Sequence, residues 1–89
     1  MIKATVRINN KLGLHARASA KLTQLAAKYQ SDVHMARNGR KINAKSIMGV
    51  MMLAAGIGAT VVIETEGSDE AEAMQAILAM IADKFGEGQ

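Results

Sequence analysis

The spacing of apolar residues switches several times between a strand period and a helix period along this 89-residue chain, and this constrains the fold most strongly. A period of two is typical of a strand with one buried face, and a period near 3.6 of an amphipathic helix. The alternation from Ile2 to Ile8 predicts a first strand. From Ala16 to Tyr29 the apolar residues follow helical spacing, which predicts a helix of roughly three turns.

The middle of the chain predicts a hairpin and a short helix. Residues 33–36 alternate again and run into Arg37-Asn38-Gly39-Arg40, where Asn-Gly is the strongest signal for a two-residue hairpin turn. Ser46 then precedes the apolar run Ile47–Leu53. This run predicts one or two helical turns that the serine caps and that Gly56 and Gly58 end.

The last third predicts a strand followed by a helix. Residues 60–63 are rich in β-branched side chains, and the segment ends at Gly67. Ser68 is the expected N-cap of a helix whose apolar residues keep helical spacing to Phe85. Gly86 ends this helix, and residues 86–89 are expected to form a loose tail.

The predicted order is therefore β-α-β-β-α-β-α with short connections. We predict an α+β fold, an open-faced two-layer β-sandwich in which a four-stranded, mainly antiparallel sheet carries three helices on one face. A chain of 89 residues has room for one domain, residues 1–89, with a thin core, so any functional site should lie on the surface. We expect a monomer.

Composition excludes several classes of function. The chain has no Cys, so it has neither disulfides nor a thiolate zinc site, and His15 and His34 alone are too few to build a metal site. The longest apolar stretch, residues 47–59, is interrupted by glycines and falls short of the roughly 20 residues that span a bilayer. The N-terminus lacks the apolar block of a signal peptide. We expect no metal, no membrane insertion and a cytoplasmic location.

The charge is strongly polarised along the sequence. Residues 1–45 hold ten of the eleven Lys and Arg and one acidic residue, a net +9, whereas residues 46–89 carry −6. A basic half suits a phosphate-bearing substrate or an acidic partner. A small nucleic-acid-binding module is the alternative from another class, but Tyr29 and Phe85, the only aromatic residues, both fall in helical patterns and offer no stacking platform on a strand. A scaffolding role comes third.

His15 is the residue best placed for chemistry. It stands at the start of the predicted first helix, where free N–H groups and the helix dipole favour an anion, and Arg17 follows two residues later. A neutral imidazole there can act as a nucleophile, and a phosphoryl group on it would meet N–H donors and a guanidinium. A plain surface histidine is the alternative. His34 alternates with buried neighbours and is expected on the surface.

Two segments resemble the HPr family, the phosphocarriers of the bacterial phosphotransferase system. They are Gly13-Leu14-His15-Ala16-Arg17-Ala18 and Ala44-Lys45-Ser46-Ile47-Met48-Gly49-Val50-Met51, at the family's spacing. The resemblance implies an open-faced β-sandwich that needs no cofactor. It also implies a phosphoryl group on Nδ1 of His15, stabilised by Arg17, taken from enzyme I and given to an enzyme IIA component.

Departures from the family pattern are small. Ala18 stands where a proline commonly follows the arginine, and Met52 stands where many members have serine. Because alanine favours helix and methionine enlarges an apolar patch, neither change argues against the function. A nitrogen-related branch of the family is the alternative, although the segment around Lys45 looks more like the sugar-system type.

The same resemblance suggests a partner surface and a second modification. We expect Ile47, Met48, Met51 and Met52 to dock partners, with Lys45 and Arg17 attracting acidic ones. Helical spacing should place Val50 and Leu53 inside and leave Met48 and Met51 more exposed. Ser46 resembles the serine that HPr kinase/phosphorylase modifies in some members of the family.

Overall fold

The computed structural model describes residues 1–87 and has the predicted order of elements. The elements are β1 (Ile2–Arg7), α1 (Ala16–Ala26), β2 (Asp32–Arg37), β3 (Arg40–Asn43), α2 (Ile47–Met52), β4 (Thr60–Glu66), α3 (Glu70–Ala82) and the 3-10 turn η1 (Lys84–Gly86). The first helix has 11 residues, which are the roughly three turns predicted, but it ends at Ala26, so Tyr29 lies in the connection to β2 and not in the helix.

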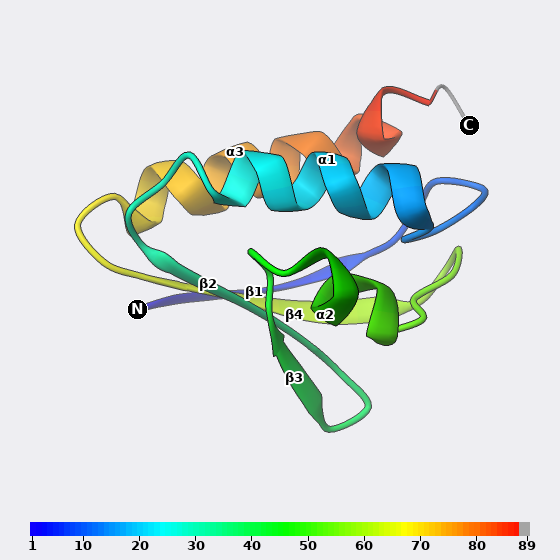
Figure 1. Ribbon diagram of the computed structural model, residues 1–89, viewed down its shortest axis with the longest axis horizontal. Coiled ribbons are helices and arrows are strands. Elements are labelled where there is room, and N and C mark those ends of the chain that lie inside the picture. Colours follow the sequence, from blue (N-terminus) through cyan, green and yellow to red (C-terminus); the bar gives the residue numbers. More distant parts are fainter. Residues whose placement is uncertain (88–89) are drawn as a thin grey trace.

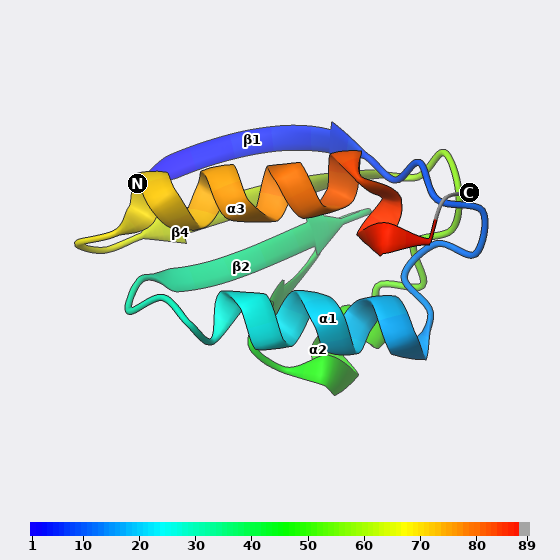
Figure 2. The ribbon, with the colours of Figure 1, turned by 90° about the horizontal axis from the view of Figure 1, so that it is seen from above.

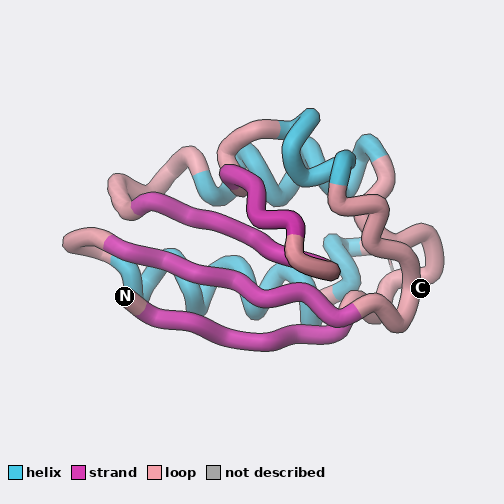
Figure 3. The backbone as a smooth tube through the Cα atoms, turned by 90° about the horizontal axis from the view of Figure 1, so that it is seen from below, coloured by secondary structure: helices cyan, strands magenta, loops and turns pink. Residues whose placement is uncertain are grey.

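The sheet has the strand order β1-β4-β2-β3, and every neighbouring pair is antiparallel. Its register places Met35 opposite Ile63, and both side chains are completely buried. Alternation then sends the intervening residues to the other face, which carries no helix (Figure 3). The predicted open-faced α+β sandwich is thus confirmed.

The helices lie on one side of the sheet. Figures 1 and 2 show α1 and α3 side by side over the strands, with α2 beside α1 on the side of β3. A core fills the space between the layers, and its largest fully buried apolar side chains are Ile8, Leu22, Val33, Met35, Val50, Val61, Ile63, Ile77 and Ile81. None of the helices within residues 1–87 is long and apolar enough to cross a membrane.

The two predicted signals in the middle of the chain are confirmed. Asn38 and Gly39 have φ of 52° and 81°, the pair of positive values that a tight hairpin turn requires. The Ser46 hydroxyl accepts a hydrogen bond from the Gly49 N–H at 3.1 Å and so caps α2. The predicted end of α2 at the glycines is wrong, because the chain already leaves the helix at Ala54 with φ of 51°.

Two predictions for α3 are also wrong, because its N-cap is not Ser68 and it ends at Ala82 and not at Gly86. Asp69, and not Ser68, is the N-cap residue, and its carboxylate accepts hydrogen bonds from the amides of Gln30 and Ser31, both at 2.9 Å, instead of from α3. The Ser31 hydroxyl donates to the same carboxylate. We call this cluster of Gln30, Ser31 and Asp69 the Asp69 latch, because it ties the start of α3 to the loop before β2.

The prediction of a loose tail from residue 86 onward is wrong for Glu87, because its carboxylate contacts Asn10 and His15. The chain leaves α3 at Ala82 and turns back through Lys84 and Phe85, both with φ of 55°. This left-handed conformation is costly for residues other than glycine, but it places Phe85 in the core with 2% exposure. The turn also directs Glu87 toward α1, while Gly88 and Gln89 lie outside the described residues.

Candidate functional site

His15 occupies the N-cap position of α1, as predicted. Its backbone is extended, with φ of −75° and ψ of −178°, and its Nδ1 accepts a hydrogen bond from the Arg17 amide at 3.3 Å. The ring is partly exposed, with 28% of its side-chain surface accessible. A ring nitrogen therefore stands directly at the start of a helix, where unpaired N–H groups and the dipole favour a bound anion.

The loop before His15 is held firmly in place. Gly13 has φ of +66°, and a Cβ atom there would lie 2.5 Å from the carbonyl oxygen of Ala55, so only glycine fits. The next residue, Leu14, is buried and donates its amide hydrogen to that same carbonyl at 2.8 Å. The buried Asn10 donates from Nδ2 to the Gly13 carbonyl at 2.8 Å. These contacts position His15 through the backbone that precedes it.

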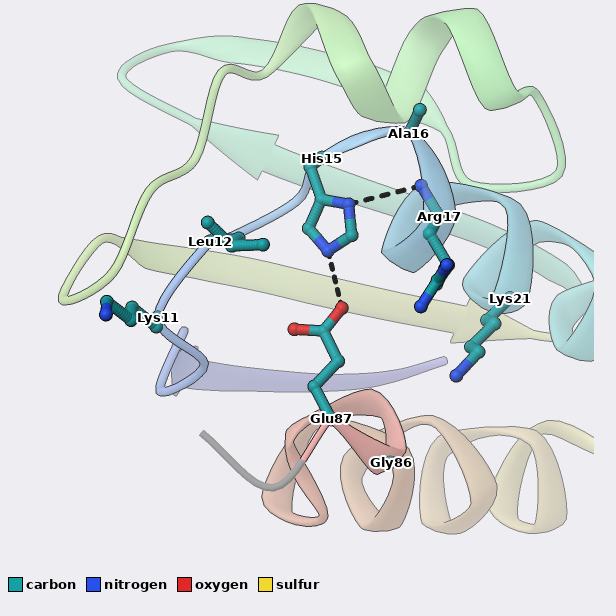
Figure 4. A pocket seen from close by; sticks show the side chains of 8 residues that line it. All are labelled: Lys11, Leu12, His15, Ala16, Arg17, Lys21, Gly86 and Glu87. Atoms are coloured by element: carbon teal, nitrogen blue, oxygen red, sulfur yellow. Dashed lines mark hydrogen bonds and ion pairs between the residues drawn. The ribbon is translucent and has the colours of Figure 1, made fainter.

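Three cationic residues line the same surface pocket as the histidine. Lys11, Arg17 and Lys21 line a surface pocket of about 710 Å³ together with His15 (Figure 4). Lys21 donates from Nζ to the Phe85 carbonyl at 2.8 Å, which fixes one positive charge at the pocket wall. The pocket thus offers positive charge next to a ring nitrogen, an arrangement that suits a dianionic phosphoryl group.

Glu87 contacts His15 from the opposite side of the pocket, and sequence reasoning missed it. Its Oε2 lies 2.5 Å from Nε2 of His15, and its Oε1 accepts a hydrogen bond from Asn10 Nδ2 at 2.9 Å. The hydrogen bonds from Asn10 and His15 lower the pKa of Glu87 below its usual 4.5. Glu87 follows His15 by 72 positions, and no local pattern connects the two.

Comparisons with known proteins show which family has this sequence and fold. A family model described as "PTS HPr component phosphorylation site" matches residues 2–83. The chain belongs to the HPr family. It is 67% identical to the phosphocarrier protein HPr of Cupriavidus necator and 53% identical to that of Neisseria meningitidis serogroup A, over the full length of both chains in each comparison. A crystal structure of HPr-C-His from Thermoanaerobacter tengcongensis matches with a TM-score of 0.95 and 45% identity, covering 98% of either chain.

This member of the HPr family is therefore a phosphocarrier protein of the phosphotransferase system. The fold predicted from the sequence is the fold of its solved relative.

The predicted docking residues form an exposed apolar patch on α2 of this HPr. Ile47, Met48, Met51 and Met52 are 40%, 66%, 40% and 55% exposed. Val50 and Leu53 are buried as predicted, but Met52 and not Met51 ranks after Met48 in exposure. We call these four exposed residues the α2 patch. Leu12, 67% exposed, adds apolar surface at the pocket itself, and the sequence interpretation did not include it.

Lys45 is separated from the histidine. Its Nζ donates to the Tyr29 carbonyl at 2.9 Å, just beyond the C-terminal end of α1, whereas His15 begins the same helix. A helix of 11 residues is about 16 Å long, so Lys45 and Arg17 contribute charge to different parts of the surface. Only Arg17, of the two predicted cations, lies next to His15.

The remaining candidates lie elsewhere. His34 is paired with Glu64 across β2 and β4, outside the pocket. No group of three or more potential metal ligands occurs within the described part of the chain. Phe85 is buried and Tyr29 follows α1, so neither aromatic ring lies on a strand.

Proposed function

We propose that this HPr carries a phosphoryl group on Nδ1 of His15. It accepts the group from a phosphohistidine of enzyme I, which is charged by phosphoenolpyruvate, and passes it to a histidine of an enzyme IIA component. The observation that carries this proposal is the position of Nδ1, which lies at the N-terminus of α1, next to Arg17 and in a pocket with two further cations.

The chemistry needs only a nucleophile and stabilisation of charge. The Nδ1 lone pair attacks phosphorus, the bond between phosphorus and the donor nitrogen breaks, and the donor ring keeps the electron pair. The first N–H groups of α1, of which the Arg17 amide already donates to Nδ1, and the guanidinium of Arg17, which lines the same pocket, would bind the phosphoryl oxygens during transfer. The protein acts as a stoichiometric carrier and not as an enzyme, and it requires no cofactor.

Mass spectrometry tests the proposal directly. Incubation with enzyme I and phosphoenolpyruvate should add the mass of one phosphoryl group, and acid should remove it. His15→Ala and His15→Asn should both abolish the gain in mass. Only asparagine should keep the cap on α1, because alanine at an N-cap lowers stability by about 0.5–2 kcal/mol. An acid-labile gain in either variant would assign the phosphoryl group to another residue.

The α2 patch is the proposed contact for both partners, with Lys45 at its edge and Arg17 beside the histidine. Met48→Asp should weaken binding to enzyme I, because a charge would enter an apolar contact. Gln75→Asp, on the exposed surface of α3, is the matched control and should bind normally. If a titration gave Met48→Asp the wild-type affinity for enzyme I, the interface would not include Met48 on α2.

We also propose phosphorylation of Ser46 by an HPr kinase/phosphorylase as a second control. The hydroxyl is exposed at the start of α2, immediately before the α2 patch. A phosphate there would place negative charge against an incoming acidic partner.

We further propose that residues 1–89 form a single cytoplasmic domain that functions as a monomer. We assign the chain to the sugar-system branch of the family and not to the nitrogen-related branch. Phosphoryl transfer from the enzyme I of each branch, compared at equal concentration, distinguishes the two. Sedimentation at working concentration tests the monomer.

A further inference from the structure

The contact between Glu87 and His15 gives the histidine ring a defined protonation. The pKa of Glu87 is lowered, so its carboxylate is ionised at neutral pH and can only accept hydrogen bonds. Because Oε2 lies 2.5 Å from His15 Nε2, the proton of the neutral ring belongs on Nε2.

The other ring nitrogen leads to the same assignment independently. The Arg17 amide points its hydrogen at Nδ1 over 3.3 Å, and an N–H donor requires an acceptor. A proton on Nδ1 would oppose this amide hydrogen. Two contacts from different parts of the chain therefore select the tautomer in which Nε2 is protonated and Nδ1 keeps its lone pair.

We propose that Glu87 is a positioning residue that fixes His15 in the Nε2–H tautomer and so directs the phosphoryl group to Nδ1. This inference deepens the proposed function and rests on His15 being the residue that is phosphorylated. Glu87 lies outside residues 2–83, the part of the chain that the family model matches.

The carboxylate also balances charge during transfer. When the Nδ1 lone pair forms the bond to phosphorus, the ring becomes positively charged, and its Nε2–H remains hydrogen-bonded to the Glu87 carboxylate. When the phosphoryl group leaves for an acceptor, the electron pair of the broken bond returns to Nδ1 and the ring is neutral again. The proton stays on Nε2 throughout, in the way that a buried carboxylate orients a catalytic histidine in hydrolases.

Asn10 holds Glu87 in the orientation that this role requires. The Asn10 side chain is completely buried, and Nδ2 donates both to the Gly13 carbonyl and to Oε1 of Glu87. Two acceptors therefore fix which end of the amide faces Glu87. The carboxylate in turn uses one oxygen for Asn10 and the other for His15.

This arrangement makes Glu87→Gln an informative variant. The Gln oxygen must face Asn10, which donates, so the Gln NH₂ group faces His15 Nε2 and donates to it. A donor at Nε2 requires an unprotonated nitrogen, so this contact favours the ring proton on Nδ1, the proposed nucleophile, against the Arg17 amide, which favours it on Nε2. Glu87→Ala removes the contact to His15 Nε2 and puts no donor in its place. Asp83→Asn is the matched control, because it removes the same charge from an exposed position nearby.

The experiment measures the ring ¹⁵N chemical shifts of the unphosphorylated protein at a pH where both histidines are neutral, with His34 as internal reference. Wild type and Asp83→Asn should have the Nε2–H tautomer at His15. Glu87→Gln should have a clearly larger share of Nδ1–H, because the Gln donor at Nε2 then competes with the Arg17 amide at Nδ1. The rate of phosphorylation by enzyme I should fall at least roughly 10-fold in Glu87→Gln, and by less than the roughly 10⁴-fold that follows when the orienting carboxylate of a hydrolase histidine becomes an amide, because the Arg17 amide still favours a free Nδ1. Glu87→Ala should lose less, with melting temperatures close to wild type.

Two results would overturn the inference. One is a wild-type tautomer at His15 in Glu87→Gln. The other is a shifted tautomer with a rate equal to that of Asp83→Asn. A failure of the proposed function can be told apart from a failure of this inference. A wild-type protein that gains no phosphoryl group on His15 would refute the function. The chemical shifts would still decide whether Glu87 sets the tautomer.

Discussion

The imidazole of His15 has a structural and a chemical role at the same atom. Nδ1 caps α1 by accepting from the Arg17 amide, and Nδ1 is also the proposed nucleophile. The hydrogen bond is long, at 3.3 Å, so little is lost when the lone pair turns to phosphorus. The same amide can then donate to a phosphoryl oxygen, which keeps the first turn of α1 capped in both states.

Arg17 should contribute mainly to the rate of transfer. Arg17→Ala removes charge-assisted contacts worth about 1.5–3 kcal/mol, which corresponds to a roughly 10- to 100-fold slower transfer. Rapid-mixing kinetics with enzyme I and with an enzyme IIA component measure both steps. Lys28→Ala, an exposed cation just after the C-terminal end of α1, is the control for loss of charge alone. Equal rates in the two variants would remove Arg17 from the mechanism.

Gly13 should matter for stability more than a typical loop glycine. Gly13→Ala combines a positive φ with a Cβ placed 2.5 Å from the Ala55 carbonyl oxygen, so the loop before His15 must shift. Gly39→Ala has a similar positive φ of +81° but no atom within 4 Å of the new Cβ, and it should cost only about 1 kcal/mol. Denaturant unfolding should give a clearly larger loss for Gly13→Ala, and equal losses would contradict the proposed close contact.

At the scale of elements, α2 is a short helix held at its ends. Ser46 caps its start, and Arg37 donates to the Leu53 carbonyl at 2.9 Å just beyond its last residue. Val50 and Leu53 anchor it in the core, while the α2 patch remains exposed. The helix therefore presents flexible methionine side chains on a fixed backbone, which suits contact with more than one partner.

Ser46→Asp should slow phosphorylation of His15 without unfolding the protein. Aspartate is as good an N-cap as serine, so the bond to the Gly49 amide is kept, and a negative charge at the start of a helix is favourable. The charge would nevertheless oppose an acidic enzyme I at the α2 patch. The rate of phosphorylation and the melting temperature should be measured together. Equal rates, or a slower rate with a large loss of stability, would leave Ser46 with its capping role alone.

Local sequence patterns predicted most of the elements but not the contacts between distant ones. The strands, the hairpin turn and the Ser46 cap were predictable because each depends on a local pattern. Ser68 and Asp69 are both good capping residues, and contacts with Gln30 and Ser31 decided their roles. Glu87 was beyond local reasoning, since its position depends on left-handed backbone at Lys84 and Phe85 and on a contact 72 residues away.

Across the whole molecule, carboxylates of the acidic half bind groups of the basic half. Asp69 joins the start of α3 to the loop before β2, and Glu87 joins the segment after α3 to the loop before α1. On the open face of the sheet, Glu64 lies between Lys41 at 2.8 Å and Lys3 at 3.5 Å. Folding thus pairs part of the acidic half with the basic half, whereas Lys11, Arg17 and Lys21 line one pocket with His15.

These contacts predict a loss of stability in acid. The Ser31 hydroxyl and the Gln30 amide hold the pKa of Asp69 below its usual 3.8, and Lys41 does the same for Glu64 relative to 4.5. Groups with a lowered pKa bind fewer protons in the folded state than in the unfolded state, so stability falls as the pH falls through their folded pKa values. The contribution should be complete above about pH 4.5 and disappear in stronger acid.

Asp69→Asn isolates the part of this effect that comes from the Asp69 latch. The variant should unfold at lower denaturant concentration than wild type near neutral pH, because the amide offers one acceptor oxygen where the carboxylate offers two. Below the folded pKa of Asp69 the wild-type carboxyl is protonated as well, so the two stability curves should converge. Ser31→Ala, which removes the hydroxyl donor and keeps the carboxylate, should change the curve in the same direction but less. Denaturant titrations over a pH series measure all three proteins, and a constant gap between wild type and Asp69→Asn at every pH would mean that the charge of Asp69 contributes nothing to the latch.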